Sequence, residues 1–170
     1  VFLIISSFLD IFKKSNYNFS RIISHLSFGF LIFFIGLNHN FSIEKDFNLK
    51  LGQTKKIENY NFILEDLKLD QKSNYKSVIG ELYIKNLVTD EKKILKPEIR
   101  IYNNPSTLTY EASIKTSFFR DYYITMSNID RSEYYNIKYQ EKPFMIWIWI
   151  SVVTLSLGGC LSLFRNAKNN

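Results

Sequence analysis

Two long apolar stretches enclose a polar region in this chain. The first runs from Arg21 to Leu37 and contains, after Arg21, sixteen residues without a formal charge. Extended to residues 19–38, it would form a helix of roughly 30 Å at about 1.5 Å per residue, which matches the hydrocarbon core of a bilayer. The second stretch, residues 144–164, has 21 residues and no formal charge. The pattern therefore predicts transmembrane helices over residues 19–38 and 143–164.

The first twelve residues are also mostly apolar, but they are too few to cross a bilayer alone. A signal peptide would carry basic residues ahead of its apolar run, whereas Lys13 and Lys14 follow it. The chain also begins with Val1 rather than Met. We therefore expect the C-terminal piece of a longer polypeptide, in which residues 1–12 are the end of a truncated transmembrane helix and residues 13–18 are a cytoplasmic turn.

Between the two predicted spans, residues 39–142 contain runs in which apolar and polar side chains alternate. Tyr60–Glu65 and Glu81–Lys85 show this alternation, which is typical of half-buried β-strands. Turn-forming residues separate such runs at Thr89–Glu91 and Asn103–Pro105. The region has no long apolar stripe with a helical period. The pattern predicts an antiparallel all-β domain, built as one sheet or as a flattened barrel.

The net charge of +6 would suit a nucleic-acid-binding protein as well as a membrane protein, so its location matters. Residues 44–142 contain 17 Lys and Arg against 15 Asp and Glu, a net of +2. A nucleic-acid surface would concentrate positive charge in this folded region, so we predict no nucleic-acid partner. The excess instead flanks the apolar stretches, at Lys13, Lys14, Arg21, Arg165 and Lys168.

This charge bias sets the expected topology. Basic residues that flank a span favour the cytosolic side, so both predicted spans have their basic ends in the cytosol. The β-domain is then expected on the opposite side of the membrane from the cytosol. We expect a multi-pass protein of the bacterial inner (plasma) membrane with its β-domain in the periplasm, or the equivalent in an organellar inner membrane. The last residues, 165–170, are predicted to be a cytoplasmic tail.

Few residues suggest chemistry in the β-domain. The sequence has no P-loop, HExxH, CxxC or CxxCH motif, and its single cysteine, Cys160, lies in a predicted span. Acidic pairs at Glu44/Asp46 and Glu65/Asp66 would suit acid–base catalysis or a cation site, yet no nucleophile or glycine-rich loop accompanies them. We expect a solvated face there, and the catalytic residues stay unknown.

One ionisable side chain, His25, falls inside the first predicted span, about one turn from its basic end. Ionisable residues in spans are costly and mark functional sites by default. A neutral imidazole is a good axial ligand for haem iron. The alternatives are a structural hydrogen bond to a neighbouring helix or, in a transporter, a proton relay. His39, fourteen residues away and about 21 Å along the axis, cannot reach the same iron, and we expect an interfacial polar role for it.

Six short segments, taken in order, resemble the C-terminal part of the CcmF family, the haem lyase subunits of bacterial-type cytochrome c maturation. The resemblance covers about residues 20 to 165, and its last segment, KPFMIWIW, runs into a span with two adjacent glycines. The segments are Arg21 with His25–Gly29, Ser42–Asp46, Gly52 with Tyr60–Phe62, Pro97–Tyr102, Thr109–Ala112 with Phe119–Tyr123, and Lys142–Trp149 with Gly158 and Gly159.

The resemblance implies a function and a role for His25. Members of the family take haem from a haem chaperone and, with other cytochrome c maturation subunits, attach it to the CxxCH cysteines of apocytochrome c. They also hold a b-type haem between two intramembrane histidines, and His25 matches one of these. We therefore predict that His25 binds haem b as an axial ligand of its iron, and that the second histidine lies outside this chain.

The family's tryptophan-rich haem-handling segment has no counterpart here, and neither have the periplasmic histidines around it. This chain alone is therefore not expected to complete a haem site or to catalyse ligation, and its own status as an enzyme is left uncertain. The alternative function is a non-catalytic, membrane-anchored assembly or adaptor domain of a membrane complex. A haem signal that is insensitive to His25 would favour that alternative.

Overall fold

The computed structural model describes residues 5–6, 19–129 and 132–169, with side chains up to residue 163. The helix end predicted over residues 1–12 and the turn predicted over residues 13–18 lie outside the described residues, apart from the helical residues 5 and 6. The chain divides into two compact units. One contains the two apolar helices together with Ser117–Arg120, and the other contains Ile43–Thr116 and Asp121–Glu141.

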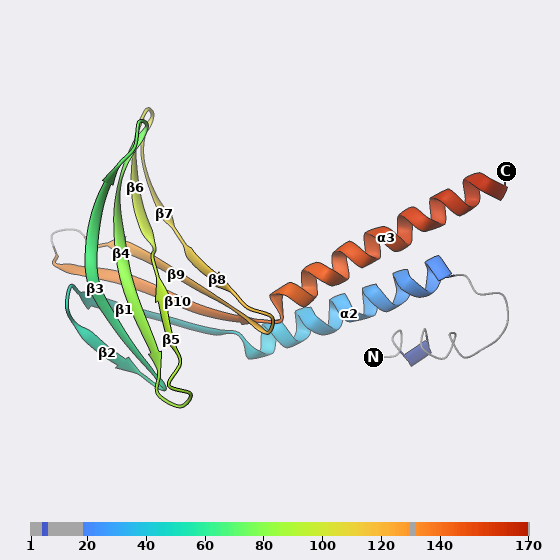
Figure 1. Ribbon diagram of the computed structural model, residues 1–170, viewed down its shortest axis with the longest axis horizontal. Coiled ribbons are helices and arrows are strands. Elements are labelled where there is room, and N and C mark those ends of the chain that lie inside the picture. The colour runs from blue at the N-terminus through green and yellow to red at the C-terminus, as the bar shows by residue number, and fades with distance from the viewer. Residues whose placement is uncertain (1–4, 7–18, 130–131, 170) are drawn as a thin grey trace. The chain divides into compact units, whose positions relative to one another are not determined.

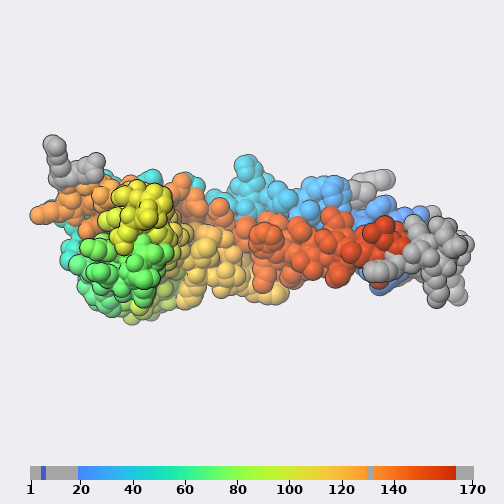
Figure 2. Space-filling model, turned by 90° about the horizontal axis from the view of Figure 1, so that it is seen from above, coloured from blue at the N-terminus to red at the C-terminus, as the bar shows by residue number. Residues whose placement is uncertain are grey.

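Two apolar helices, α2 (Phe19–Phe41) and α3 (Met145–Asn169), dominate the first unit. Within the described residues, these are the two helices long and apolar enough to cross a membrane. They pack against each other along their length (Figures 1 and 2). The backbone of α2 stays helical for three residues beyond the predicted span, and residues 165–169 continue α3.

The β-domain has ten strands within the described residues. They are β1 (Ile43–Lys50), β2 (Thr54–Ile57), β3 (Tyr60–Gln71), β4 (Tyr75–Asn86), β5 (Lys92–Leu95), β6 (Glu98–Asn103), β7 (Ser106–Glu111), β8 (Ser113–Thr116), β9 (Arg120–Asn128) and β10 (Tyr134–Pro143). One sheet has the strand order β1-β10-β9-β8, and the other has the order β2-β3-β4-β6-β7, with β5 also paired to β4. Figure 1 shows β3 and β4 as long, curved neighbours.

The predicted fold class is confirmed, because two apolar helices flank an antiparallel all-β domain along the chain. The expectation of a single sheet or flattened barrel was wrong, since the strands form two separate sheets. Each sheet has one apolar face, and stacking the two faces removes both from water. The shared core consists of Phe47, Leu49, Phe62, Leu64, Leu82, Ile84, Leu95, Ile99, Tyr122, Ile124, Met126, Ile137 and Tyr139.

The two sheets approach each other closely in this core. The rings of Phe47 on β1 and Phe62 on β3 have centroids 4.7 Å apart. A Cβ at Gly80 on β4 would lie 2.8 Å from the Sδ of Met126 on β9, so the absence of a side chain there makes room for the methionine. The β-domain is therefore a sandwich with a dense interior.

Candidate functional site

Small residues bring the backbones of α2 and α3 close together. The Oγ of Ser20 donates a buried hydrogen bond of 2.7 Å to the carbonyl oxygen of Gly158. A Cβ at Gly158 would lie 2.5 Å from the Oγ of Ser24 and 3.0 Å from its backbone nitrogen, so the contact requires glycine. Ser20, Ser24 and Ser27 follow the spacing that places residues on one face of a helix. This face of α2 therefore packs on α3.

An aromatic cluster holds the other end of the same interface. The ring of Phe34 stacks on Trp147, with centroids 5.5 Å apart. Phe118, which belongs to the same unit, meets Trp147 edge-on at 4.9 Å. The side-chain amide of Asn38 donates a hydrogen bond of 2.6 Å to the carbonyl oxygen of Pro143. Contacts at both ends therefore set the rotation of α2 about its own axis.

His25 lies on a different face of α2. It follows Ser24 directly, so it is rotated by about 100° from the packed serine, and its side chain is exposed. Phe28 and Ile32 are on the same side of the helix and are also exposed, at 45% and 54%. The imidazole thus lies on an apolar surface that α3 leaves uncovered, and the exposed Arg21 lies one turn before it on the same face. Such a surface suits a flat apolar ligand or a further helix.

The structure does not bring the two histidines together. His39 is exposed in the last turn of α2, and the continuous helix separates it from His25 by about 21 Å. One iron cannot bind both side chains. Across residues 5–6, 19–129 and 132–169, no group of three or more His, Cys, Asp or Glu side chains could hold a metal ion.

The acidic pair on β1 faces partners on the neighbouring strand β10. The Oε1 of Glu44 lies 2.5 Å from the Nζ of Lys138. The Oδ1 of Asp46 accepts a hydrogen bond of 2.6 Å from the side-chain amide of Asn136. These residues form a polar surface of cross-strand pairs.

The second acidic pair lies at a bulge in β3, where the register to β4 shifts between Leu64 and Asp66. The Oδ1 of Asp66 accepts a hydrogen bond of 2.8 Å from the backbone N–H of Leu67. The hydroxyl of Tyr83 donates a hydrogen bond to Glu65, and this bond, with the charge of the carboxylate, raises the pKa of Tyr83 above its ordinary value. Glu65 and Asp66 are thus held by local contacts on the strand pair.

The interior of the sandwich contains polar groups that the sequence analysis did not identify. The buried hydroxyl of Tyr139 donates a hydrogen bond of 2.7 Å to the buried carboxylate of Glu141. Burial, together with this bond, raises the pKa of Tyr139 far above its ordinary value. The Nζ of Lys93 lies 3.7 Å from the ring centroid of Tyr122. Glu141 and Lys93 occupy positions of β10 and β5 that face the core. The alternation of inward and outward positions along these strands could have identified both residues from the sequence.

The fold of the β-domain and the two helices together define a class of protein. In this class, the sequence of a β-sandwich lies between two apolar helices that are long enough to cross a bilayer. A family model described as "CcmF C-terminal beta-sandwich" matches residues 40–143, which is more than half of the chain. The chain therefore belongs to the CcmF C-terminal β-sandwich family. The resemblance seen in the six short segments is confirmed by this match.

Individual relatives extend the similarity beyond the β-domain. The chain is 29% identical to the cytochrome c-type biogenesis protein CcmF of Pseudomonas aeruginosa over 142 residues, which are 82% of this chain and 21% of that protein. It is 26% identical to the protein of the same name from Haemophilus influenzae over 159 residues, which are 94% of this chain and 24% of that protein. The chain thus spans between a fifth and a quarter of the length of these relatives.

A solved structure shares the fold. The cytochrome c haem lyase CcmF superposes on this chain with a TM-score of 0.60 and 13% sequence identity. The superposition covers 82% of this chain and 23% of that structure. At this identity the likeness concerns the fold alone.

Proposed function

We propose that this chain is the C-terminal part of a CcmF-type haem lyase, which acts in cytochrome c biogenesis. The observation that carries the proposal is the family match over residues 40–143, extended by relatives that align over more than four fifths of the chain. The proposed partners are haem, the haem chaperone and other maturation subunits, and apocytochrome c. The proposed location is the bacterial inner membrane or an organellar inner membrane.

His25 is proposed to be one axial ligand of a b-type haem. The donor fits, because imidazole nitrogen is a common ligand of haem iron. The surroundings also fit, because the side chain lies among exposed apolar residues such as Phe28 and Ile32, which could pack on a porphyrin. The described residues supply one ligand, so the second histidine must come from another part of the complete protein. When bound, the haem would supply one-electron chemistry within the membrane.

The residues of this chain position that ligand. The bond from Ser20 to Gly158 and the stack of Phe34 on Trp147 hold α2 against α3 at both ends. These contacts keep His25 on the uncovered side of α2. A ligand fixed in direction by helix packing loses little freedom on binding, which favours a well-defined coordination geometry.

The test is His25→Ala in the complete protein, with His39→Ala as the matched control on the same helix. The purified wild-type protein should show the absorption spectrum of a six-coordinate b-type haem, and His25→Ala should lose it or shift it to a five-coordinate form. His39→Ala should leave the spectrum unchanged, because that ring is about 21 Å away along the helix. A wild-type spectrum in His25→Ala would refute haem ligation and favour a non-catalytic assembly or adaptor domain.

The β-domain is proposed to be the part that docks apocytochrome c and partner subunits on the periplasmic or equivalent side. This domain is a dense sandwich. The family model matches residues 40–143, which include the whole sandwich and its immediate flanks. A rigid scaffold of this kind can present binding surfaces at its sheet edges and loops.

A further inference from the structure

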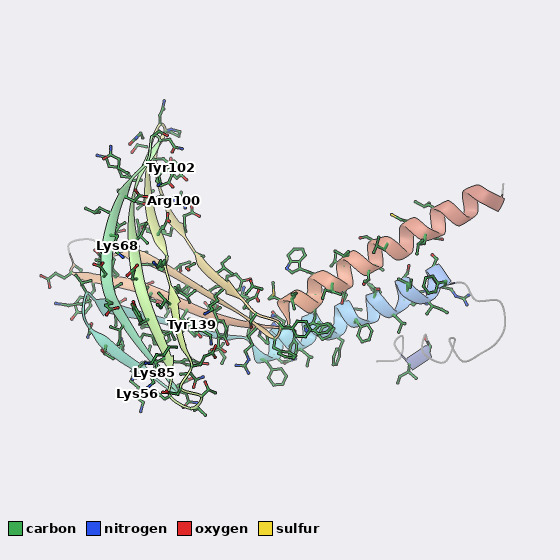
Figure 3. All side chains as sticks on the ribbon, in the orientation of Figure 1. Lys56, Lys68, Lys85, Arg100, Tyr102 and Tyr139 are labelled. Atoms are coloured by element: carbon green, nitrogen blue, oxygen red, sulfur yellow. The ribbon has the colours of Figure 1, made fainter. Side chains whose placement is uncertain are left out.

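A row of basic side chains crosses the outer face of the six-stranded sheet. Lys56 on β2 stands opposite Asn61 on β3, and Asn61 stands opposite Lys85 on β4. Lys85 in turn stands opposite Lys92 on β5. These four residues, here called the lysine row, alternate with inward positions of their strands and so face outward. Figure 3 shows Lys56 and Lys85 near each other at one end of the β-domain, with Lys68 further along the strands.

The lysine row places like charges opposite each other. Lys85 and Lys92 are direct neighbours on paired strands, and such a pair destabilises a sheet. Elsewhere on the same face the lysines lie beside a carboxylate, because the Nζ atoms of Lys68 and Lys96 are each 2.8 Å from the Oε1 of Glu81. The pairing of β4 with β5 therefore does not explain the charges of the lysine row.

One carboxylate offsets part of this charge. The Oδ1 of Asp90, in the turn before β5, lies 2.6 Å from the Nζ of Lys85, and the Asp90 side chain is 79% exposed. The bond from Lys85 and, more weakly, the charge of Lys92 lower the pKa of Asp90. Within the described residues Lys92 forms no ion pair, and neither does Lys56. One negative charge thus faces three positive ones.

A hollow of about 280 Å³ lies against the lysine row. Asn61, Lys85 and Lys92 line its basic side. Ile63 and Tyr83, which stand opposite each other in the next outward row, also line it. Basic and amide groups therefore meet an aliphatic and an aromatic side chain in one hollow.

The lining of this hollow includes one carboxylate, Glu65. It accepts a hydrogen bond from the hydroxyl of Tyr83. Glu65 lies four residues along β3 from Asn61, which is roughly 13 Å in an extended strand. The hollow is therefore basic at the end formed by the lysine row and acidic at the other end.

We propose that the lysine row binds a small molecule that carries a phosphate or carboxylate group. The ammonium groups of Lys85 and Lys92 and the side-chain amide of Asn61 can donate hydrogen bonds to its oxygens. A bound oxyanion also removes the repulsion between the two opposed lysines. Ile63 and Tyr83 offer an apolar surface to the remainder of the molecule. This site is independent of the haem proposed at His25.

The experiment uses the complete protein in nanodiscs of phosphatidylcholine, with empty nanodiscs as the blank. The probes are phenyl phosphate, benzoate and the uncharged phenol, and binding is measured by saturation-transfer NMR of the probe. We expect phenyl phosphate or benzoate to bind and phenol not to bind. Lys92→Gln should weaken binding about fivefold or more, because a charge-assisted hydrogen bond is lost. Lys85→Gln should act in the same direction.

Lys96→Gln is the matched control. It removes the same charge four residues further along the chain and on the same face, where the lysine already pairs with Glu81. We expect Lys96→Gln to weaken binding less than about twofold, because its charge is not part of the row. Thermal unfolding gives a second readout. The probe should raise the midpoint of the wild type but not that of Lys92→Gln, whose midpoint without probe should not be lower than that of the wild type.

The outcomes separate the possible sources of the oxyanion. Displacement of phenyl phosphate by an equal concentration of inorganic phosphate would support a free anion as the ligand. Displacement only by aromatic anions would support an oxyanion on an apolar body. No binding by the wild type, equal binding by Lys92→Gln, or an equal loss in Lys96→Gln would overturn the inference. A lower midpoint of Lys92→Gln without probe would also overturn it, because it would show a structural role. His25→Ala should leave probe binding unchanged, so this test and the haem test fail separately.

Discussion

At the scale of single residues, partners within a few ångströms decide how a charged side chain behaves. Glu81 on β4 lies between two lysines, and its Oε1 is 2.8 Å from the Nζ of Lys68 and 2.8 Å from the Nζ of Lys96. These two hydrogen bonds lower the pKa of Glu81 to about 2. The bonds favour the ionised carboxylate, and the neutral acid would lose them.

We predict that Glu81 stays ionised in mildly acidic buffer. Because its pKa is lower in the folded state than in the unfolded chain, its contribution to stability is complete above the ordinary glutamate pKa of about 4.3 and is lost as the pH falls towards 2. Removing both partners, in Lys68→Ala with Lys96→Ala, should return the pKa to its ordinary range. A titration of the side-chain carboxyl carbon by NMR measures this. Titration of wild-type Glu81 near pH 4 would contradict the prediction.

At the scale of elements, the pairing of α2 with α3 depends on one close backbone approach. Gly158 lies against Ser24, whereas a Cβ at the adjacent Gly159 would meet nothing within 4 Å. Two neighbouring glycines of α3 therefore have different roles. One permits helix contact, and the other faces open space.

We predict that Gly158→Ala destabilises the helix pair and Gly159→Ala does not. The new methyl group at position 158 would overlap Ser24, and such overpacking typically costs about 1–3 kcal/mol. Thermal unfolding of the complete protein in detergent should show a lower midpoint for Gly158→Ala alone. The haem spectrum should be perturbed in the same variant if helix packing positions His25. Equal midpoints for the two variants would argue against a tight contact at Gly158.

At the scale of the whole molecule, the expected topology follows from charges that flank two apolar helices. Val88 in the turn after β4 is 73% exposed, so it offers a reporter on the β-domain. Lys168 lies in the basic segment after the second apolar stretch. The two positions should be on opposite sides of the membrane.

We predict that Val88→Cys, in a Cys160→Ser background, reacts with a membrane-impermeant maleimide from the periplasmic side of intact cells. Lys168→Cys in the same background should react only after the inner membrane is opened, because basic flanks favour the cytosol. Labelling is measured by the mass shift of the purified protein. The reverse pattern would place the β-domain in the cytosol.

The apolar helices and the all-β character of the middle region could be predicted from the sequence, because both depend on local periodicity. The division into two sheets could not be predicted. Phe62 and Phe47 belong to different sheets, yet their strands show the same kind of alternation. Which apolar faces meet depends on long-range pairing, as does the register of β3 with β4 around its bulge.

The candidate site shows the same division between local and long-range information. The sequence by itself determined that an imidazole lies within sixteen otherwise uncharged residues, because hydropathy and charge are properties of the residues in order. Only the tertiary structure decided which way that imidazole faces, because the direction depends on where Gly158 lets α3 approach Ser24.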